Sequence, residues 1–140
     1  MLGDTGGISV GEALCRGSVL TYCSLKKNDI SDDGAIRIAQ GIDQDARFLK
    51  EMHLGWNEIS DIGGEYLGKV LLKNTTLNKL DLSNNKLKNT TAAVFIVSLK
   101  RNKYIKLLNL DDNMISSHLN KQIQAAIMAN RGKGTEQKIV

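Results

Sequence analysis

The chain repeats one short pattern four times, and this repetition constrains the fold more than any other feature of the sequence. An asparagine marks the same place in each copy, with separations of 29, 28 and 28 residues by subtraction, at Asn28, Asn57, Asn85 and Asn113. Self-similarity at a period of about 20–50 residues is typical of solenoid proteins. The sequence therefore predicts a stack of similar units, each packed only on its neighbours.

Each copy combines a strand pattern with a helix pattern. The first half reads L-x-x-L-x-L-x-x-N-x-I/L, and its apolar positions in the third copy are Leu77, Leu80, Leu82 and Leu87. The L-x-L spacing is typical of a short half-buried strand. In the second half, apolar residues lie four apart, as at Leu67 and Leu71, which is one face of a helix. Each repeat is predicted to be strand, turn and helix.

The repeated asparagine follows the predicted strand, where the chain must turn. Its carboxamide both donates and accepts hydrogen bonds, so stacked copies would form a ladder that satisfies the turn backbone. Residues that favour helix starts follow each turn, and we expect them to cap their own helices: Asp32, Asp33, Asp61, Thr90, Thr91, Ser116 and Ser117. Basic residues mark the predicted helix ends at Lys73, Lys100, Arg101 and Arg131.

The segment Leu77-Asn-Lys-Leu-Asp-Leu-Ser-Asn-Asn-Lys-Leu, with Ile59-Ser-Asp-Ile-Gly and Ile30-Ser-Asp-Asp-Gly, resembles the ribonuclease-inhibitor-like leucine-rich repeat family. The resemblance covers roughly residues 20–132. It implies an α/β solenoid, a short curved horseshoe with parallel strands on the concave face and helices on the convex face. Three departures occur: Cys23 replaces the usual leucine in the first copy, the third and fourth copies lack the turn glycine, and the first copy has one extra residue near Asp43-Gln44-Asp45.

The repeats divide the chain into three expected parts. Residues 20–131 form four leucine-rich repeats of 28–29 residues, and 132–140 form a flexible tail without the pattern. Residues 1–19 look like the helical half of a further repeat, since Asp4-Thr-Gly6 matches the opening of the later helices. This half-repeat favours a fragment of a longer array, with a natural helical cap as the alternative.

Composition narrows the function. Hydrophobic residues make up 41% of the chain, the net charge is +4, and no stretch is apolar enough to cross a membrane. The first residues lack a secretory pattern, so we expect a cytoplasmic protein with Cys15 and Cys23 as free thiols. Nucleic-acid binding is disfavoured, because the densest basic cluster falls at a predicted helix end and in the following turn, where solvated lysines complement the helix dipole: Lys100, Arg101, Lys103 and Lys106.

Catalytic motifs are lacking. His53 and His118 show no metal-ligand spacing, and the carboxylates form no evident acid–base pair. Gly132-Lys-Gly-Thr lacks the flanking glycine of a phosphate loop. We therefore expect no enzyme, no cofactor and no metal.

The resemblance places a protein-binding surface on the strand side. Between the buried leucines, each strand would direct side chains toward a partner, and we expect partner contacts from Trp56, Tyr22, His53, Glu51, Lys26, Lys79, Asp81, Asn109 and Asp111. Trp56, the single tryptophan, is the expected anchor, because tryptophan and tyrosine dominate binding hot spots. The alternative is that Trp56 packs on Lys27 and Asn84 of the adjacent repeats.

The leading functional hypothesis is a non-enzymatic protein-interaction module or assembly subunit. The resemblance is compatible with several settings: innate immune receptors, actin-capping proteins of the tropomodulin type, and axonemal assemblies. The alternative from another class is a regulator of a small GTPase, like the leucine-rich-repeat activators of Ran, although the acidic tail of those proteins is missing here. The sequence does not distinguish among these partners.

Overall fold

The computed structural model describes the backbone of residues 1–139 and the side chains of residues 1–132. Helices and strands alternate along the chain in the order α1 (Gly3–Cys15), β1 (Tyr22–Ser24), α2 (Asp32–Asp45), β2 (Glu51–His53), α3 (Asp61–Val70), β3 (Lys79–Asp81), α4 (Asn89–Leu99), β4 (Leu107–Asn109) and α5 (Ser117–Ile139).

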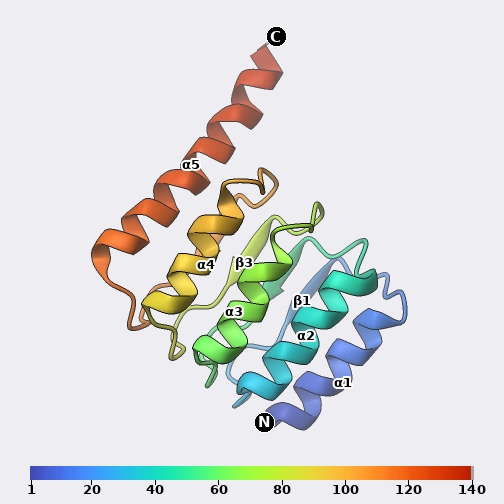
Figure 1. Ribbon diagram of the computed structural model, residues 1–140. Helices are drawn as coiled ribbons and strands as arrows, with labels where there is room; N and C mark the ends of the chain where they lie inside the picture. The colour runs from blue at the N-terminus through green and yellow to red at the C-terminus, as the bar shows by residue number, and fades with distance from the viewer. Residues whose placement is uncertain (140) are drawn as a thin grey trace.

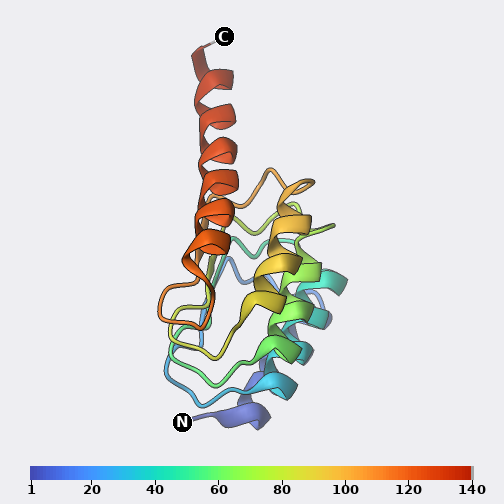
Figure 2. The ribbon, with the colours of Figure 1, turned by 60° about the vertical axis from the view of Figure 1, so that its left-hand side comes forward.

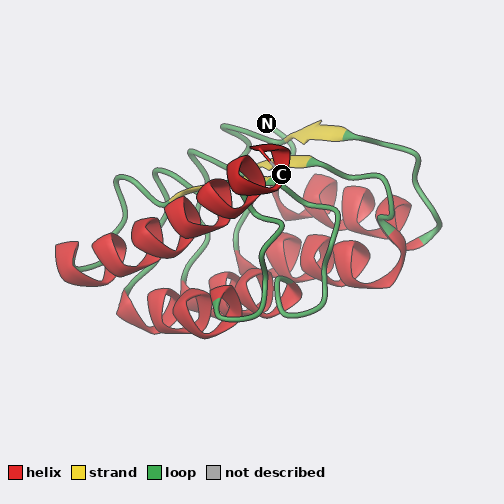
Figure 3. Ribbon diagram, turned by 90° about the horizontal axis from the view of Figure 1, so that it is seen from above, coloured by secondary structure: helices red, strands yellow, loops and turns green. Residues whose placement is uncertain are grey.

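The elements form two layers. The strands make one parallel sheet in the order β1-β2-β3-β4, and Tyr22, Glu51, Lys79 and Leu107 lie side by side in register. Helices α1 to α4 stand in a row on one side of the sheet (Figures 1 and 3). The alternation of strand and helix and the all-parallel sheet confirm the predicted α/β leucine-rich repeat solenoid.

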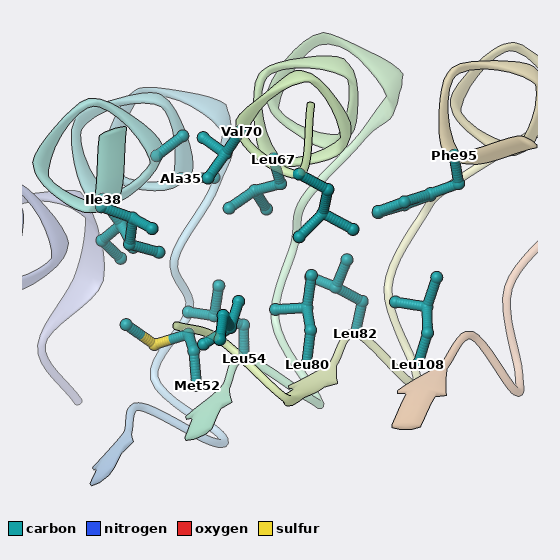
Figure 4. Packing of buried hydrophobic residues seen from close by; sticks show 14 of the residues in the cluster. Ala35, Ile38, Met52, Leu54, Leu67, Val70, Leu80, Leu82, Phe95 and Leu108 are labelled. Carbon is teal, nitrogen blue, oxygen red and sulfur yellow. The ribbon is translucent and has the colours of Figure 1, made fainter. Parts of the chain in front are cut away.

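The core lies between the two layers. From the strand layer, Met52, Leu80 and Leu108 point toward the helices, and Phe95 approaches them from α4 (Figure 4). All four side chains are buried. The apolar frame of each repeat therefore stacks on the next to form one continuous core, as the spacing predicts.

The asparagines form the predicted ladder. Asn57 Oδ1 accepts the backbone N–H of Asn28 (3.1 Å) and of Ile30 (2.9 Å) in the preceding repeat. Its Nδ2 donates to the carbonyl oxygens of Leu25 (3.0 Å) and Leu54 (2.9 Å). One buried carboxamide thus satisfies backbone groups of two neighbouring turns.

Asn85→Ala is expected to lower the free energy of unfolding by about 2 kcal/mol, because the buried backbone groups that Asn85 contacts lose their partner. Asn84→Gly is the matched control. Asn84 has a left-handed φ of 54°, which glycine adopts without strain, and its side chain lies outside the ladder. Urea denaturation of both variants measures the difference, and equal losses would remove the ladder as the cause.

The aspartates at the helix starts do not cap their own helices, and that part of the sequence-based prediction is wrong. The capping positions are occupied by Ser31, Ser60 and Lys88. Asp32 instead reaches the next repeat, where its carboxylate accepts the N–H groups of Ser60 and Gly63, each at 2.9 Å. Asp32 therefore bridges the starts of α2 and α3.

The same bridge recurs at both neighbouring boundaries. Asp4 accepts the N–H groups of Ser31 (2.8 Å) and Gly34 (3.0 Å), and Asp61 accepts those of Lys88 (2.8 Å) and Thr91 (3.3 Å), as well as the Thr91 hydroxyl. Burial by itself would raise the pKa of Asp61, but the hydrogen bonds from Thr91 and Lys88 outweigh it and hold the pKa below 3.8. The pKa of Asp4 is lowered in the same way against the effect of burial.

Asp61→Asn is expected to destabilise the protein by about 1 kcal/mol at neutral pH, through loss of charge-assisted hydrogen bonds. Since folding lowers the pKa of Asp61 from its ordinary value, the carboxylate contributes stability at pH values above that ordinary pKa and loses it as the pH falls through the lowered pKa. The deficit of the variant should therefore shrink in acid. Denaturation at neutral pH and in acid, below the ordinary pKa of the carboxyl group, measures the deficit, with Asp33→Asn at an exposed residue in the first turn of α2 as the control. A deficit that stays constant with pH would contradict the assignment.

A second set of stacked asparagines follows the helices. Asn102 Nδ2 donates to the carbonyl oxygens of Leu71 (2.8 Å) and Asn74 (3.0 Å), one repeat earlier. Asn130 Nδ2 likewise donates to carbonyl oxygens of the preceding turn, those of Asn102 and Ile105, each at 3.1 Å. These residues fasten the helix ends of adjacent repeats together.

The last helix departs from the row of the others. In Figure 2, α5 rises on the strand side of the molecule, apart from α1 to α4. It contacts α4 and β4, buries Ile123 and Ile127, and is continuous to Ile139. The helix end predicted at Arg131 is therefore wrong. The predicted flexible tail, 132–140, lies almost wholly outside the residues whose side chains the structure describes.

Candidate protein-binding surface

The strand face comprises the side chains that the strands direct away from the helices. Because successive residues of a strand point to opposite sides, the residues flanking the buried strand centres share this face. They are Tyr22, Ser24, Glu51, His53, Lys79, Asp81, Leu107 and Asn109.

Five of the predicted contact residues form one connected cluster on β1, β2 and β3. The rings of Tyr22 and His53 lie 5.1 Å apart at an interplanar angle of 40°. His53 Nε2 is 3.2 Å from Glu51 Oε2, and Lys79 Nζ is 3.2 Å from Glu51 Oε1. His53 Nδ1 lies 3.8 Å from the Asp81 carboxylate. The structure thus brings these predicted residues together, and we call them the strand-face cluster.

Hydrogen bonding within the strand-face cluster sets the charge of Glu51. The contacts with His53 and then Lys79 lower the pKa of Glu51, outweighing the opposing effect of desolvation. The carboxylate is therefore ionised at neutral pH and is held between two potential donors. The strand-face cluster therefore holds four groups in position before any partner arrives: the ring of Tyr22, the imidazole of His53, the carboxylate of Glu51 and the ammonium group of Lys79.

Asp81 differs from the prediction in its exposure. Only 7% of Asp81 is exposed, although it was expected to face a partner, and Ser83 beside it is also buried. The cause is local: Asp81 Oδ1 accepts the backbone N–H of Ser83 at 3.0 Å and its hydroxyl at 2.7 Å. The carboxylate of Asp81 is therefore occupied by Ser83, and its role in the strand-face cluster is to position His53.

Trp56 lies apart from the strand-face cluster. Its side chain is about half exposed, at 51%, and Lys27 Nζ lies 5.3 Å from its ring centre. Within the part of the chain with described side chains, no ring contact or hydrogen bond joins Trp56 to Tyr22 or His53. The predicted single patch is thus two adjoining areas. Trp56 borders a shallow depression at the turn edge, lined by Met1, Lys27, Asp29, Trp56, Asn57, Glu58, Asn84, Asn85 and Lys86.

The backbone of Trp56 has an unusual conformation. Its φ is 57°, in the left-handed region, and a φ between 54° and 59° recurs one position before the other ladder asparagines, at Lys27, Asn84 and Asp112. Asparagine and aspartate tolerate this region, whereas a bulky residue pays about 1 kcal/mol or more. The ladder geometry therefore imposes a strained backbone on Trp56. The same backbone conformation places its indole at the turn edge.

The remaining predicted residues extend the strand face at both ends. Lys26 is exposed and reaches across Gly55: a Cβ at Gly55 would lie 3.3 Å from Lys26 Cε. Asn109 is half-buried and accepts the N–H of Asp111, which is itself exposed. Lysines therefore stand beside β1 and acidic groups beside β4.

Sequence reasoning missed the surroundings of Trp56. Glu58 and Lys86 form an ion pair at the rim of the depression. Their separation of one repeat was visible in the sequence, because they occupy the same position in successive copies. Their position after the asparagine, rather than within the strand pattern, is why they were not considered.

Other site types find no support in the described residues. Among them, no group of three or more histidine, cysteine or acidic side chains is arranged to hold a metal ion, and no helix there is long and apolar enough to cross a membrane. Cys15 and Cys23 are both free thiols.

Comparison with known proteins agrees with the repeat pattern. A leucine-rich repeat family model matches residues 19–39, 46–68 and 73–91. Ribonuclease inhibitor from Mus musculus is 30% identical over 88 residues, which are 63% of this chain and 19% of that protein. The Sus scrofa ribonuclease inhibitor is 33% identical over 72 residues, 51% of this chain and 16% of that protein. The chain thus spans less than a fifth of the length of these relatives.

Two solved structures share the fold over nearly the whole chain. The tropomodulin C-terminal domain from Caenorhabditis elegans superposes with a TM-score of 0.83 at 16% identity, covering 97% of this chain and 81% of that one. Leiomodin-1 Actin-Binding Site 2 superposes with a TM-score of 0.78 at 12% identity, covering 94% and 92%. At these identities the likeness concerns the fold alone. Together with the repeat frame and the ladder, the matches support the resemblance of this chain to the ribonuclease-inhibitor-like leucine-rich repeat family.

Proposed function

We propose that this protein is a non-enzymatic interaction module that binds a protein partner through its strand face. The strand-face cluster carries the proposal, because Tyr22, His53, Glu51 and Lys79 are joined across three neighbouring strands before binding. Side chains that are already positioned lose little conformational entropy when a partner arrives. Tyrosine supplies contact area, and the surrounding charges supply orientation.

The charge distribution favours a protein partner over a polyanion. Lys26 and Lys27 stand at the β1 end, whereas Asp111 and Asp112 stand at the β4 end, and all four are exposed. A nucleic acid would meet repulsion from the acidic end, whereas a folded protein can match both signs. Trp56 extends this surface to the turn edge as a second anchor. The free thiols of Cys15 and Cys23 suit a protein of the cytoplasm, where cysteines stay reduced.

Actin is the first partner to test. One of the two structural neighbours is named as an actin-binding site of leiomodin-1, and it matches this chain over 94% of its length. The other is the C-terminal domain of tropomodulin. The support for actin as a partner is the shared architecture alone. The test therefore substitutes residues on the strand face of this chain.

Tyr22→Ala and Trp56→Ala test the proposed surface. Loss of an aromatic hot spot costs about 2 kcal/mol or more in binding, roughly thirtyfold in affinity. Tyr66→Ala on α3 is the matched control, because Tyr66 is also exposed but lies on the helix side. Affinity is measured by titrating actin, and any partner captured by the intact protein, against each variant after thermal melts verify folding.

The titration of actin and the titration of a captured partner test two different points. Binding of actin that weakens with Tyr22→Ala and not with Tyr66→Ala supports the actin assignment. Binding of a different captured protein with the same dependence supports the strand face and rejects actin. If the affinity is unchanged in Tyr22→Ala and Trp56→Ala but is lost in Tyr66→Ala, the binding surface lies on the helix side.

A further inference from the structure

Charge is unevenly distributed along the chain, and the middle of the sequence is strongly basic. Between Tyr66 and Leu110 the sequence has nine lysine and arginine residues and one acidic residue, Asp81. Asp81 is buried, and its carboxylate accepts hydrogen bonds from Ser83. The surface that this part of the chain contributes is therefore positively charged.

Two of these basic residues bind backbone carbonyls of the helices. Lys103 Nζ donates to the carbonyl oxygen of Leu99, at the end of α4, at 3.2 Å. Lys106 Nζ donates to the carbonyl oxygen of Asn130, in α5, at 2.7 Å. Both ammonium groups thus stabilise the backbone, and their charge is used within the fold.

Three other basic residues lie at the same edge of the molecule without a partner. Lys73 lies shortly after the end of α3, and Lys100 and Arg101 directly follow α4. All three are exposed, and among the described side chains none forms a hydrogen bond or an ion pair with them. Their charge is therefore available to a binding partner.

The stacking of the repeats brings these cations together. Lys73 and Arg101 are 28 residues apart by subtraction, so they occupy the same position of successive repeats, as do Leu72 and Lys100. Helices α3 and α4 lie side by side (Figure 1), and the axes of packed helices are about 8–10 Å apart. We call the four residues Leu72, Lys73, Lys100 and Arg101 the helix-end patch.

Hydrogen bonds across the two turns hold the helix-end patch in place. The carboxamide of Asn102, the residue after Arg101, donates to the preceding turn. Its acceptors are the carbonyl oxygens of Leu71 (2.8 Å) and Asn74 (3.0 Å), which enclose the α3 half of the patch. Within that half, Leu72 is an apolar residue with 37% of its surface exposed. The patch therefore presents three cations and one apolar side chain on two turns that are fixed to each other.

We propose that the helix-end patch binds a short acidic segment of a partner protein, in which carboxylates flank an apolar side chain. The guanidinium of Arg101 pairs with one carboxylate through two parallel hydrogen bonds, and Lys73 and Lys100 pair with others. The apolar side chain of the segment covers Leu72. This surface lies at the helix ends, apart from the strand face, so the protein has a second binding surface beyond its proposed function.

The extent of the helix-end patch favours a protein segment over a nucleic acid. Beside Lys73, the end of α2 contributes the exposed Asp43, and both residues line one depression of about 270 Å³. A nucleic acid needs cations along a continuous row of phosphates, and Asp43 interrupts such a row after two turns. A short segment can end before it reaches this carboxylate.

The probe is a capped synthetic peptide, Gly-Asp-Glu-Leu-Glu-Asp-Gly, and the neutral control peptide is Gly-Asn-Gln-Leu-Gln-Asn-Gly. Each peptide is titrated into the intact, isotope-labelled protein while the backbone amide resonances are followed. We expect saturable shifts at Lys73 and Arg101 with the acidic peptide and about tenfold weaker binding, or more, of the neutral peptide. Added salt should weaken the binding of the acidic peptide, because it screens charges on the surface.

A double variant with Lys73→Gln and Arg101→Gln should weaken binding of the acidic peptide by about tenfold, because two of the three cations are removed. Lys88→Gln with Lys121→Gln is the matched control, since it removes the same charge from exposed lysines elsewhere, before α4 and on α5. It should bind the peptide as the unaltered protein does. Leu72→Ser should weaken binding by a smaller factor, and thermal melts verify that each variant folds.

Four results would overturn the proposal. They are the absence of saturable binding, equal binding of the two peptides, an equal loss in both double variants, and tighter binding of an oligouridylate of the same charge at the same residues. The equal loss would mean that net charge alone attracts the peptide, and the tighter oligouridylate would assign the patch to nucleic acid. Neither actin nor a captured partner is present in this test, so its failure is distinguishable from failure of the strand-face proposal.

Discussion

Leu82→Ala is expected to lower the free energy of unfolding by about 2–5 kcal/mol, the usual cost of removing a buried leucine. Leu82 is fully buried and lies between the strand and helix layers in the middle of the stack (Figure 4). Since the ladder fixes the backbone just after it through Asn85 Nδ2, which donates to the Leu82 carbonyl at 3.1 Å, the cavity has little freedom to collapse.

Urea denaturation followed by circular dichroism measures this loss. Val97→Ala is the control, because Val97 is more than half exposed on α4 and alanine is the better helix former. We expect a change within about 0.5 kcal/mol for the control, as for other surface substitutions. A loss that is equally small for Leu82→Ala would mean that the core does not pass between these layers as described.

Gly41→Ala is expected to cost about 3 kcal/mol, the upper part of the range for overpacking. A Cβ at Gly41 would lie 2.4 Å from the Gly11 carbonyl oxygen and 2.7 Å from Leu14 Cβ. The first obstacle is the backbone of α1, so the helix must move as a whole. Helices α1 and α2 approach closely because Gly7 also meets Gly34 at this interface.

The same substitution at Gly132 is the matched control with the opposite sign. A Cβ there meets nothing within 4 Å, and the residue lies within α5. Alanine is better than glycine in an exposed helix by about 1 kcal/mol, so Gly132→Ala should stabilise the protein slightly. Thermal and urea melts of the two variants decide the matter. A stabilising effect at Gly41 would contradict the close contact between α1 and α2.

The fold could be predicted because the sequence repeats its own spacing. Leu80, Leu82 and Asn85 occupy fixed places in every copy, so four weak signals reinforce one another. The aspartate bridges were not predictable in the same way. An aspartate at a helix start suits a local cap in any isolated helix, and only stacking places Asp32 within reach of Ser60 in the next repeat.

The candidate site was predicted in part for the same reason. Alternation along each strand placed Tyr22, His53 and Lys79 on one face, and the parallel register brought them together. The alternation does not predict which side chains form hydrogen bonds within the turns or where the turns direct them. The turn after β3 buries Asp81 against Ser83, and the left-handed turn after β2 carries Trp56 away from the strand-face cluster.

The unequal ends of the sheet have a consequence for how this protein loses its structure. In a linear array, stability is a sum of unit and nearest-neighbour energies, so the terminal unit with fewer neighbours frays first. Among the described residues, β4 contacts both β3 and α5, whereas β1 contacts β2 alone. We expect opening to begin at β1 and to spread toward α5, so that deuterium enters the amides around Cys23 first and those around Leu108 last. Refolding would run in reverse, with the last repeat and α5 as the template on which the others assemble.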